Sequence, residues 1–170
     1  VFSGKFVSGK NVEIFEKEYA KYIGTKYAVA VNSCTAALHA SLASLGLKGG
    51  DEVIVPAISF VSSATAILHQ GCTPIFCDVN LENYCLSAES LEKSITKKTK
   101  AIIPVHFAGS ACEMKKIVKI AKKYKLTIIE DCAQAHGTKY YGKKVGTFGT
   151  ISCFSFYATK HMTTGEGGIL

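Results

Sequence analysis

The sequence contains no arginine, although its formal net charge is +7. All twenty basic residues are lysines, whereas arginine supplies the bidentate contacts to guanine and phosphate that base readout favours. Six of the lysines fall on one predicted helix, where we expect a solvated face: Lys115, Lys116, Lys119, Lys122, Lys123 and Lys125. The composition therefore argues against a nucleic-acid partner and leaves only non-specific electrostatic attraction as the alternative.

Long hydrophobic runs are also missing. No apolar run reaches the roughly 18 residues that a membrane span needs, so we expect no membrane partner. The first residues lack the pattern of a secretory signal peptide and an initiator Met, and we expect a fragment or mature piece of a longer, cytoplasmic protein. The 170 residues, 48% of them hydrophobic, suffice for one well-packed domain.

Several short motifs are absent. The seven cysteines show no CxxC spacing and no histidine partners at set offsets, so we predict no metal site. Cys77 and Cys153 fall in apolar runs and are expected to be small buried side chains in a reducing compartment. The loops GxxxxGK[ST] and GxGxxG are missing too, which argues against kinases, NTPases and Rossmann dehydrogenases.

Apolar runs of strand length alternate with amphipathic segments along the chain. The predicted strands are 27–31, 52–55, 74–77, 101–105, 126–129 and 151–156, and residues 167–170 resemble the start of another. The predicted helices are 12–23, 35–45, 60–70, 87–95 and 113–124, followed by a long loop at 133–149. Fully apolar strands separated by helices indicate one α/β domain whose mostly parallel sheet has helices on both faces.

Polar side chains follow the predicted strands, where an open α/β sheet places its ligand. Residues 32–35 open a helix directly after a strand, which makes either an anion site or an ordinary N-cap. Asp131 ends an apolar strand and needs a partner, either a lysine or helix N-terminus or a protonated heterocycle nitrogen. Gln134 is placed to reach a neighbouring phenolic oxygen. Lys160 follows the last strand, where a lysine is either a solvated surface charge or the amine that holds an aldehyde cofactor.

Four segments in one register resemble the DegT/DnrJ/EryC1/StrS family, the sugar-nucleotide aminotransferases that depend on pyridoxal 5′-phosphate (PLP). They are residues 33–38, 51–56, 129–137 and 155–168, and the segment 9–16 matches the family's entry helix. The resemblance covers nearly the whole chain. It implies the large domain of a fold type I, aspartate aminotransferase-like transferase, with residues 1–170 as a partial PLP-binding domain that lacks its N-terminal start and the C-terminal small domain.

The resemblance implies a role for each residue at the ring of the cofactor. Lys160 would form the Schiff base and, once released, move the proton between the substrate carbon and C4′. Asp131 would pair with the pyridinium nitrogen and Gln134 with the 3′-oxygen. Phe60 would stack on the ring face.

A second group would hold the phosphate. It comprises the backbone at Cys34 and Thr35 and the hydroxyl of Ser155. Two departures accompany the match, because Cys34 stands where the family usually has glycine and residues 105–110 match only loosely its tyrosine-glycine-glutamine run. An asparagine that the partner subunit of a homodimer contributes would lie beyond Leu170.

The implied activity is transfer of an amino group from an amino acid, with L-glutamate as the expected donor, to a keto-sugar nucleotide in amino-sugar or surface polysaccharide biosynthesis. The fragment itself is expected to be inactive. One alternative is a PLP-dependent sugar-nucleotide dehydratase, which carries histidine in place of the lysine. Lys160 argues against it, and His161 is one place off register. The other alternative is a truncated, non-catalytic binding or regulatory domain.

Overall fold

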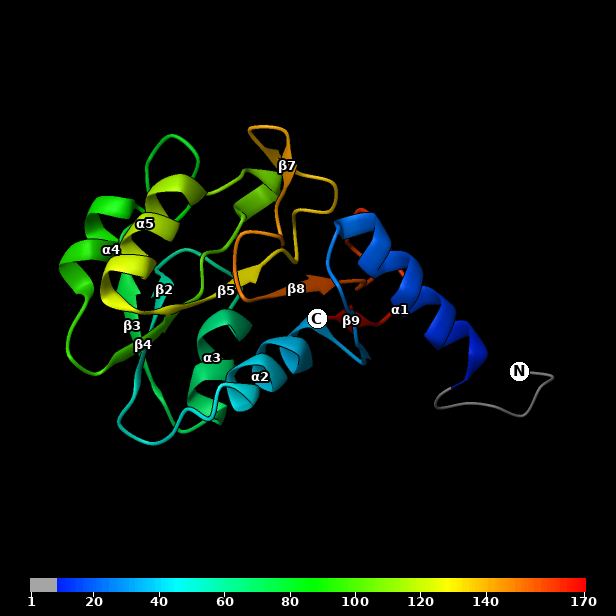
Figure 1. Ribbon diagram of the computed structural model, residues 1–170, viewed down its shortest axis with the longest axis horizontal. Coiled ribbons are helices and arrows are strands. Elements are labelled where there is room, and N and C mark those ends of the chain that lie inside the picture. The colour runs from blue at the N-terminus through cyan, green and yellow to red at the C-terminus, as the bar shows by residue number, and fades with distance from the viewer. Residues whose placement is uncertain (1–8) are drawn as a thin grey trace.

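A computed structural model describes residues 9–170 (Figure 1), and residues 1–8, where a signal-peptide pattern was sought, lie outside the described residues. The helices are α1 (Lys10–Ile23), α2 (Cys34–Ser44), α3 (Ser62–His69), α4 (Ala88–Ser94) and α5 (Met114–Tyr124), with a 3₁₀ turn η1 (Phe107–Gly109). The strands are β1 (Ala30–Val31), β2 (Glu52–Pro56), β3 (Thr73–Cys77), β4 (Thr99–Ile102), β5 (Thr127–Asp131), β6 (Lys139–Tyr140), β7 (Lys143–Lys144), β8 (Ile151–Ser155) and β9 (Gly168–Ile169). No helix in the described part of the chain is long and apolar enough to cross a membrane.

Seven strands form one sheet in the order β1-β9-β8-β5-β4-β2-β3. From β8 to β3 every pairing is parallel, while β9 runs antiparallel to both β8 and β1. The prediction of a mostly parallel α/β sheet is therefore confirmed. Because parallel strands end at one edge, the segments that follow β2, β5 and β8 meet there.

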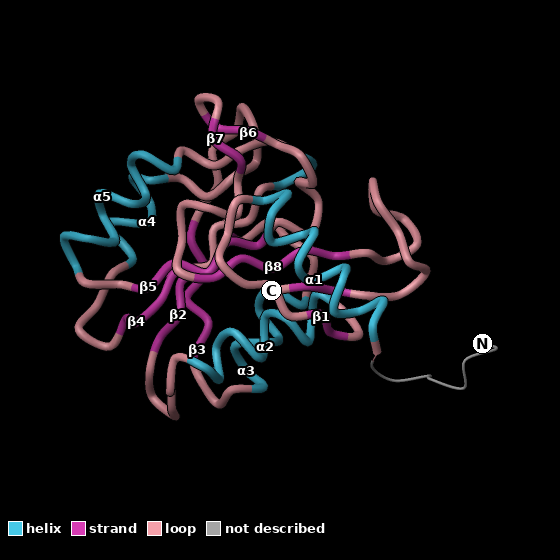
Figure 2. Tube along the Cα trace, turned by 45° about the vertical axis from the view of Figure 1, so that its right-hand side comes forward, coloured by secondary structure: helices cyan, strands magenta, loops and turns pink. Residues whose placement is uncertain are grey.

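Helices cover both faces of the sheet, as Figures 1 and 2 show. Helices α2 and α3 pack on one face, where Val53 and Val55 of β2 point. Helices α4 and α5 pack on the other face against Ile54, and α1 covers that face at the β8–β9 end through Tyr19 and Phe154. The alternation along β2 follows from the period of two in a strand, which sends neighbouring side chains to opposite faces.

Some predicted boundaries were wrong. The strand expected at 27–31 covers only Ala30–Val31, which is β1. Tyr27 and Val29, which precede this edge strand, are 73% and 51% exposed. Helix α3 begins at Ser62, two residues after Phe60. The strand expected at 101–105 ends at Ile102, since Pro104 has no N–H for the ladder. The long loop contains the small β6–β7 hairpin, which stands apart from the main sheet in Figure 2.

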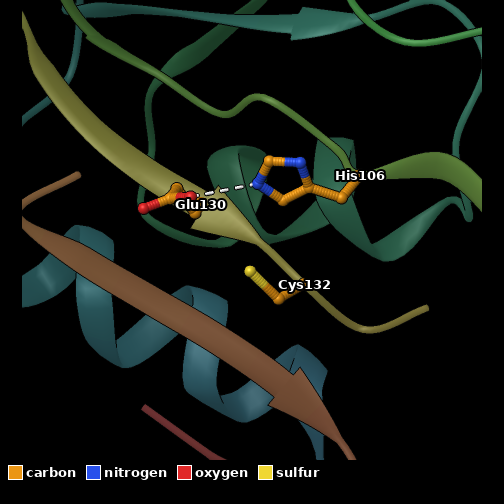
Figure 3. A group of neighbouring side chains, drawn as sticks. All are labelled: His106, Glu130 and Cys132. Carbon is orange, nitrogen blue, oxygen red and sulfur yellow. Dashed lines mark hydrogen bonds and ion pairs between the residues drawn. The ribbon is translucent and has the colours of Figure 1, made fainter. Parts of the chain in front are cut away.

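The side chain of Glu130 is fully buried and accepts four hydrogen bonds, of which Figure 3 shows the one from His106. Its Oε2 accepts from His106 Nε2 at 3.0 Å and from the Gly146 N–H at 2.8 Å. Its Oε1 accepts the N–H groups of Phe148 and Gly149, both at 2.7 Å. Burial alone would raise the pKa of Glu130, but these donors hold it below the ordinary value of 4.5. The network fixes the loop before β8 against β5.

His106, Glu130 and Cys132 are all buried and place one potential metal-ligand atom each within 4.8 Å of one another (Figure 3). His106 Nδ1 accepts the Cys112 N–H at 3.1 Å, so the ring proton sits on Nε2 and faces Glu130. Burial also raises the pKa of the Cys132 thiol well above its ordinary value, which disfavours the thiolate that a metal would need. We therefore assign this cluster a structural role.

Substituting Glu130→Ala should destabilise the protein by about 3–5 kcal/mol, because four donors lose their acceptor in a buried site. The free energy of unfolding from a urea titration measures the loss. Because the pKa of Glu130 is lowered in the folded state, wild type loses this stabilisation when the carboxylate is protonated at acidic pH. The difference in unfolding free energy between the two proteins should therefore shrink as the pH falls below 4.5. Glu92→Ala, which removes an exposed partner of Lys123, is the control and should change little. Equal effects of the two substitutions would contradict this account.

Candidate active site

One cavity of about 230 Å³ lies at the carboxyl edge of the sheet, and all seven predicted site residues line it. They come from the start of α2, the segment before α3, the end of β5, the loop after it, the end of β8 and the loop that follows: Cys34, Thr35, Phe60, Asp131, Gln134, Ser155 and Lys160. The structure therefore brings together residues that are up to 126 positions apart, from Cys34 to Lys160. Larger hollows lie elsewhere on the surface. The one between α4 and α5 is lined by exposed glutamates and lysines that form ion pairs with one another.

The start of α2 presents backbone donors to this cavity. Ser33 caps the helix, since its Oγ accepts the Ala36 N–H at 3.2 Å and its carbonyl accepts that of Ala37. The N–H groups of Cys34 and Thr35 make no hydrogen bond with any residue of 9–170. Free N–H groups at the positive end of a helix dipole are suited to an anion such as phosphate. The sequence was compatible with either an anion site or an ordinary N-cap. In the structure Ser33 caps the helix, and the N–H groups of the first two helical residues have no partner within residues 9–170.

The glycine at position 168 is required by the close approach of β9 to this helix start. A Cβ there would lie 2.3 Å from the Ser33 carbonyl carbon and 2.6 Å from the Cys34 nitrogen, and both are backbone atoms that cannot yield. The side chain of Cys34 is only 6% exposed and packs in the core with α2 and α3. A side chain at position 34 is thus accommodated, and burial keeps its thiol protonated by raising its pKa.

Asp131 is a buried carboxylate whose hydrogen-bond donors within residues 9–170 are both neutral. Its Oδ2 accepts from Ser63 Oγ at 2.7 Å and its Oδ1 from the Ala133 N–H at 3.1 Å. Within residues 9–170 no lysine or histidine forms an ion pair with it. Burial raises the pKa of this carboxyl above 3.8, although the two hydrogen bonds oppose the shift. A buried negative charge without a cation is suited to a cationic ligand group at the same edge.

Lys160 and Gln134 approach the cavity from two different loops. Lys160 lies in the turn after β8, where its N–H donates to the Tyr157 carbonyl, and its Nζ forms no ion pair or hydrogen bond with a described residue. Gln134 Oε1 accepts the Ala108 N–H at 2.8 Å. That bond identifies the oxygen of the amide and leaves its NH₂ group as the donor toward the cavity. Phe60, 67% exposed, stands at the rim.

Ser155 is held by two residues to which the sequence analysis gave no role. His136 Nε2 donates to the Ser155 carbonyl at 2.7 Å, and the hydroxyl of Tyr19 donates to His136 Nδ1 at 3.0 Å. Burial lowers the pKa of His136, consistent with a neutral ring in these bonds. Ser63 was also missed, because a serine in the first turn of α3 carries no signal in the sequence until the carboxylate opposite it is placed.

The chain belongs to the DegT/DnrJ/EryC1/StrS aminotransferase family, whose family model matches residues 1–170. It is 48% identical over 162 residues to a GDP-perosamine synthase of Escherichia coli O157:H7, an alignment that covers 95% of this chain and 44% of the relative. The chain thus spans less than half the length of this relative.

Solved structures share the fold. The structure of S. venezuelae DesV in complex with a ketimine intermediate matches with a TM-score of 0.95 and 38% identity, over 99% of this chain and 46% of that one. The structure of NtdA from Bacillus subtilis with bound cofactor PMP matches with a TM-score of 0.91 and 39% identity, over 98% of this chain and 38% of that one. The similarity therefore extends over part of each known chain.

Asp131→Asn should stabilise the cofactor-free protein at neutral pH, because it removes a buried charge that forms no ion pair within residues 9–170. The folded-state pKa of Asp131 is raised, so wild type is most stable with this carboxyl protonated and loses that stability as the pH rises through the raised pKa. The greater stability of Asp131→Asn relative to wild type should disappear as the pH falls to about 4, where the wild-type carboxyl is also uncharged. Urea midpoints of both proteins across this range measure it. A constant difference at all pH values would contradict the assignment.

Proposed function

We propose that the full-length protein is a PLP-dependent aminotransferase that moves an amino group from an amino acid, with L-glutamate as donor, to a keto-sugar nucleotide. The observation that carries the proposal is the shared cavity of Lys160, Asp131 and the start of α2. Among the described residues, it combines a side-chain amine that forms no ion pair or hydrogen bond, a buried carboxylate that forms no ion pair, and backbone N–H groups that are free to bind an anion. The family membership and the activity for which the GDP-perosamine synthase relative is named support the sugar substrate.

The residues present fit PLP. The N–H groups of Cys34 and Thr35, with the hydroxyl of Ser155, would hold the phosphate, because a helix start favours that anion. Asp131 would face the ring nitrogen and keep it cationic, which satisfies the carboxylate that the protein leaves unpaired. The NH₂ group of Gln134 would donate to the 3′-oxygen, and Phe60 would cover the ring face.

The chemistry divides between cofactor and chain. When bound, PLP supplies an electron sink that stabilises negative charge on the substrate carbon. Lys160 would anchor the cofactor covalently and, once released, hold and deliver the proton between that carbon and C4′. Asp131 would hold a proton on the ring nitrogen throughout. Phe60 would exclude water from one face of the reacting bond.

Two further parts of the proposal concern the whole protein. Residues 1–170 would form part of the large, PLP-binding domain, and the protein would act as a homodimer in the synthesis of amino sugars for surface polysaccharide. Exposed apolar side chains on α3 and on the segment before it support the dimer, since Phe60 and Val61 are 67% and 64% exposed and Leu68 is 56% exposed. A second copy packed against them would bury this apolar surface and cover Phe60 at the rim of the cavity.

Lys160→Ala should abolish the covalent cofactor adduct that borohydride fixes in the wild-type protein, because no other amine reaches the cavity from the described residues. Peptide mass spectrometry locates the adduct. Amino transfer from glutamate to keto-sugar nucleotides should fall by at least about a thousandfold, since the variant loses both anchor and base.

Lys97→Ala is the matched control, an exposed lysine outside the cavity that should keep both adduct and activity. An adduct on another lysine would refute the role of Lys160. A deoxy-sugar product in place of an amino-sugar from the wild-type protein would instead favour the dehydratase.

A further inference from the structure

A chain of two serine hydroxyls ends on the carboxylate of Asp131. Ser63 Oγ lies 2.7 Å from Asp131 Oδ2, and Ser59 Oγ lies 2.6 Å from Ser63 Oγ. A hydroxyl has one proton and an ionised carboxylate only accepts, so Ser63 donates to Asp131. Ser59 must then donate to Ser63. Both hydrogen-bond dipoles point toward the carboxylate.

The hydrogen bond between Ser63 and Asp131 is shielded from water. Ser63 is fully buried and Asp131 is 4% exposed, so water does not replace the hydroxyl. Hydrogen bonds to an ionised group are shorter and roughly twice as strong as neutral ones, and the low dielectric of the interior strengthens them further. Ser63 also lies in the first turn of α3, whose dipole places positive potential on the same side.

A comparison with another buried serine shows that this arrangement is not the ordinary one. Ser41 in α2 is also fully buried, and its hydroxyl donates to the Ala37 carbonyl of its own helix at 2.7 Å. A helical serine usually directs its hydroxyl proton to its own helix in this way. The tertiary neighbour of Ser41 Oγ is a thiol, Cys153 Sγ at 3.3 Å, and not a carboxylate. Ser63 instead donates across to β5, to a group that lines the cavity.

We propose that Ser63, supported by Ser59, is a positioning residue that keeps Asp131 ionised and oriented toward the cationic ring nitrogen of the cofactor. The inference rests on the proposed function and adds a determinant of ring protonation to it. Ser63 fixes Oδ2 and the Ala133 N–H fixes Oδ1, so the plane of the carboxylate is set from both sides. Without the Ser63 donor the carboxylate becomes more basic, and the proton that it shares with the ring nitrogen moves toward Asp131.

The test is nitrogen-15 NMR of the full-length protein loaded with PLP labelled at the ring nitrogen. Wild type should show the chemical shift of a protonated ring. Ser63→Ala should move the shift toward the unprotonated value and lower kcat by roughly tenfold with little change in KM. Ser63→Thr keeps the hydroxyl and should restore both readouts, while Ser59→Ala should give a smaller displacement in the same direction.

Ser41→Ala is the control for the loss of a buried hydroxyl, and it should leave the nitrogen shift unchanged. A wild-type shift in Ser63→Ala, with PLP bound, would overturn this inference and leave the proposed function intact. If Ser63→Ala does not fold, Ser59→Ala takes its place, and an unchanged nitrogen shift in that variant overturns the inference as well. A wild-type protein that binds no PLP at Lys160 would overturn the proposed function and this inference with it.

Discussion

Two adjacent carboxylates at the end of β5 impose the constraint on which the rest of the structure depends. Strand geometry sends Glu130 to one face of the sheet and Asp131 to the other, so each needs its own set of donors. Glu130 takes four N–H groups and organises the loop before β8. Asp131 accepts hydrogen bonds from two neutral donors and forms no ion pair within residues 9–170. One carboxylate completes the fold, and its neighbour lines the cavity.

The two sites are mechanically linked through His106. Its ring donates to Glu130, while its backbone N–H donates to the Asp131 carbonyl at 3.0 Å. The end of β5 is therefore held by a side-chain hydrogen bond to Glu130 and by a backbone hydrogen bond to Asp131, both from His106 in the segment after β4. Rigid support of this kind keeps a carboxylate at a cavity in place, although the supporting residues do not line the cavity themselves. The cluster that resembles a metal site serves the neighbouring cavity in this way.

Local signals in the sequence predicted the elements and most of the cavity. Gly24 closes α1 in the left-handed conformation and Ser87 caps α4 through the Ser90 N–H, as expected from their residue types. Strand-end reasoning found Asp131 and Lys160 because parallel strands share an edge. The strand start expected at 167–170 is confirmed as β9. Its antiparallel pairing and the partners of Glu130 were not predictable, since they depend on contacts between segments far apart in the chain. Ser63 looked like any helical serine until the carboxylate opposite it was placed.

The seven cysteines carry a practical consequence. All are free and buried, and they are spread over the three hydrophobic clusters, with Cys34 in the first, Cys85 in the second and Cys132 in the third. A thiol reagent reaches such groups only when the surrounding packing opens. The chain therefore contains its own set of reporters for local opening, one or more in each part of the core. Their relative labelling rates would show whether the cavity opens alone or together with the rest of the sheet.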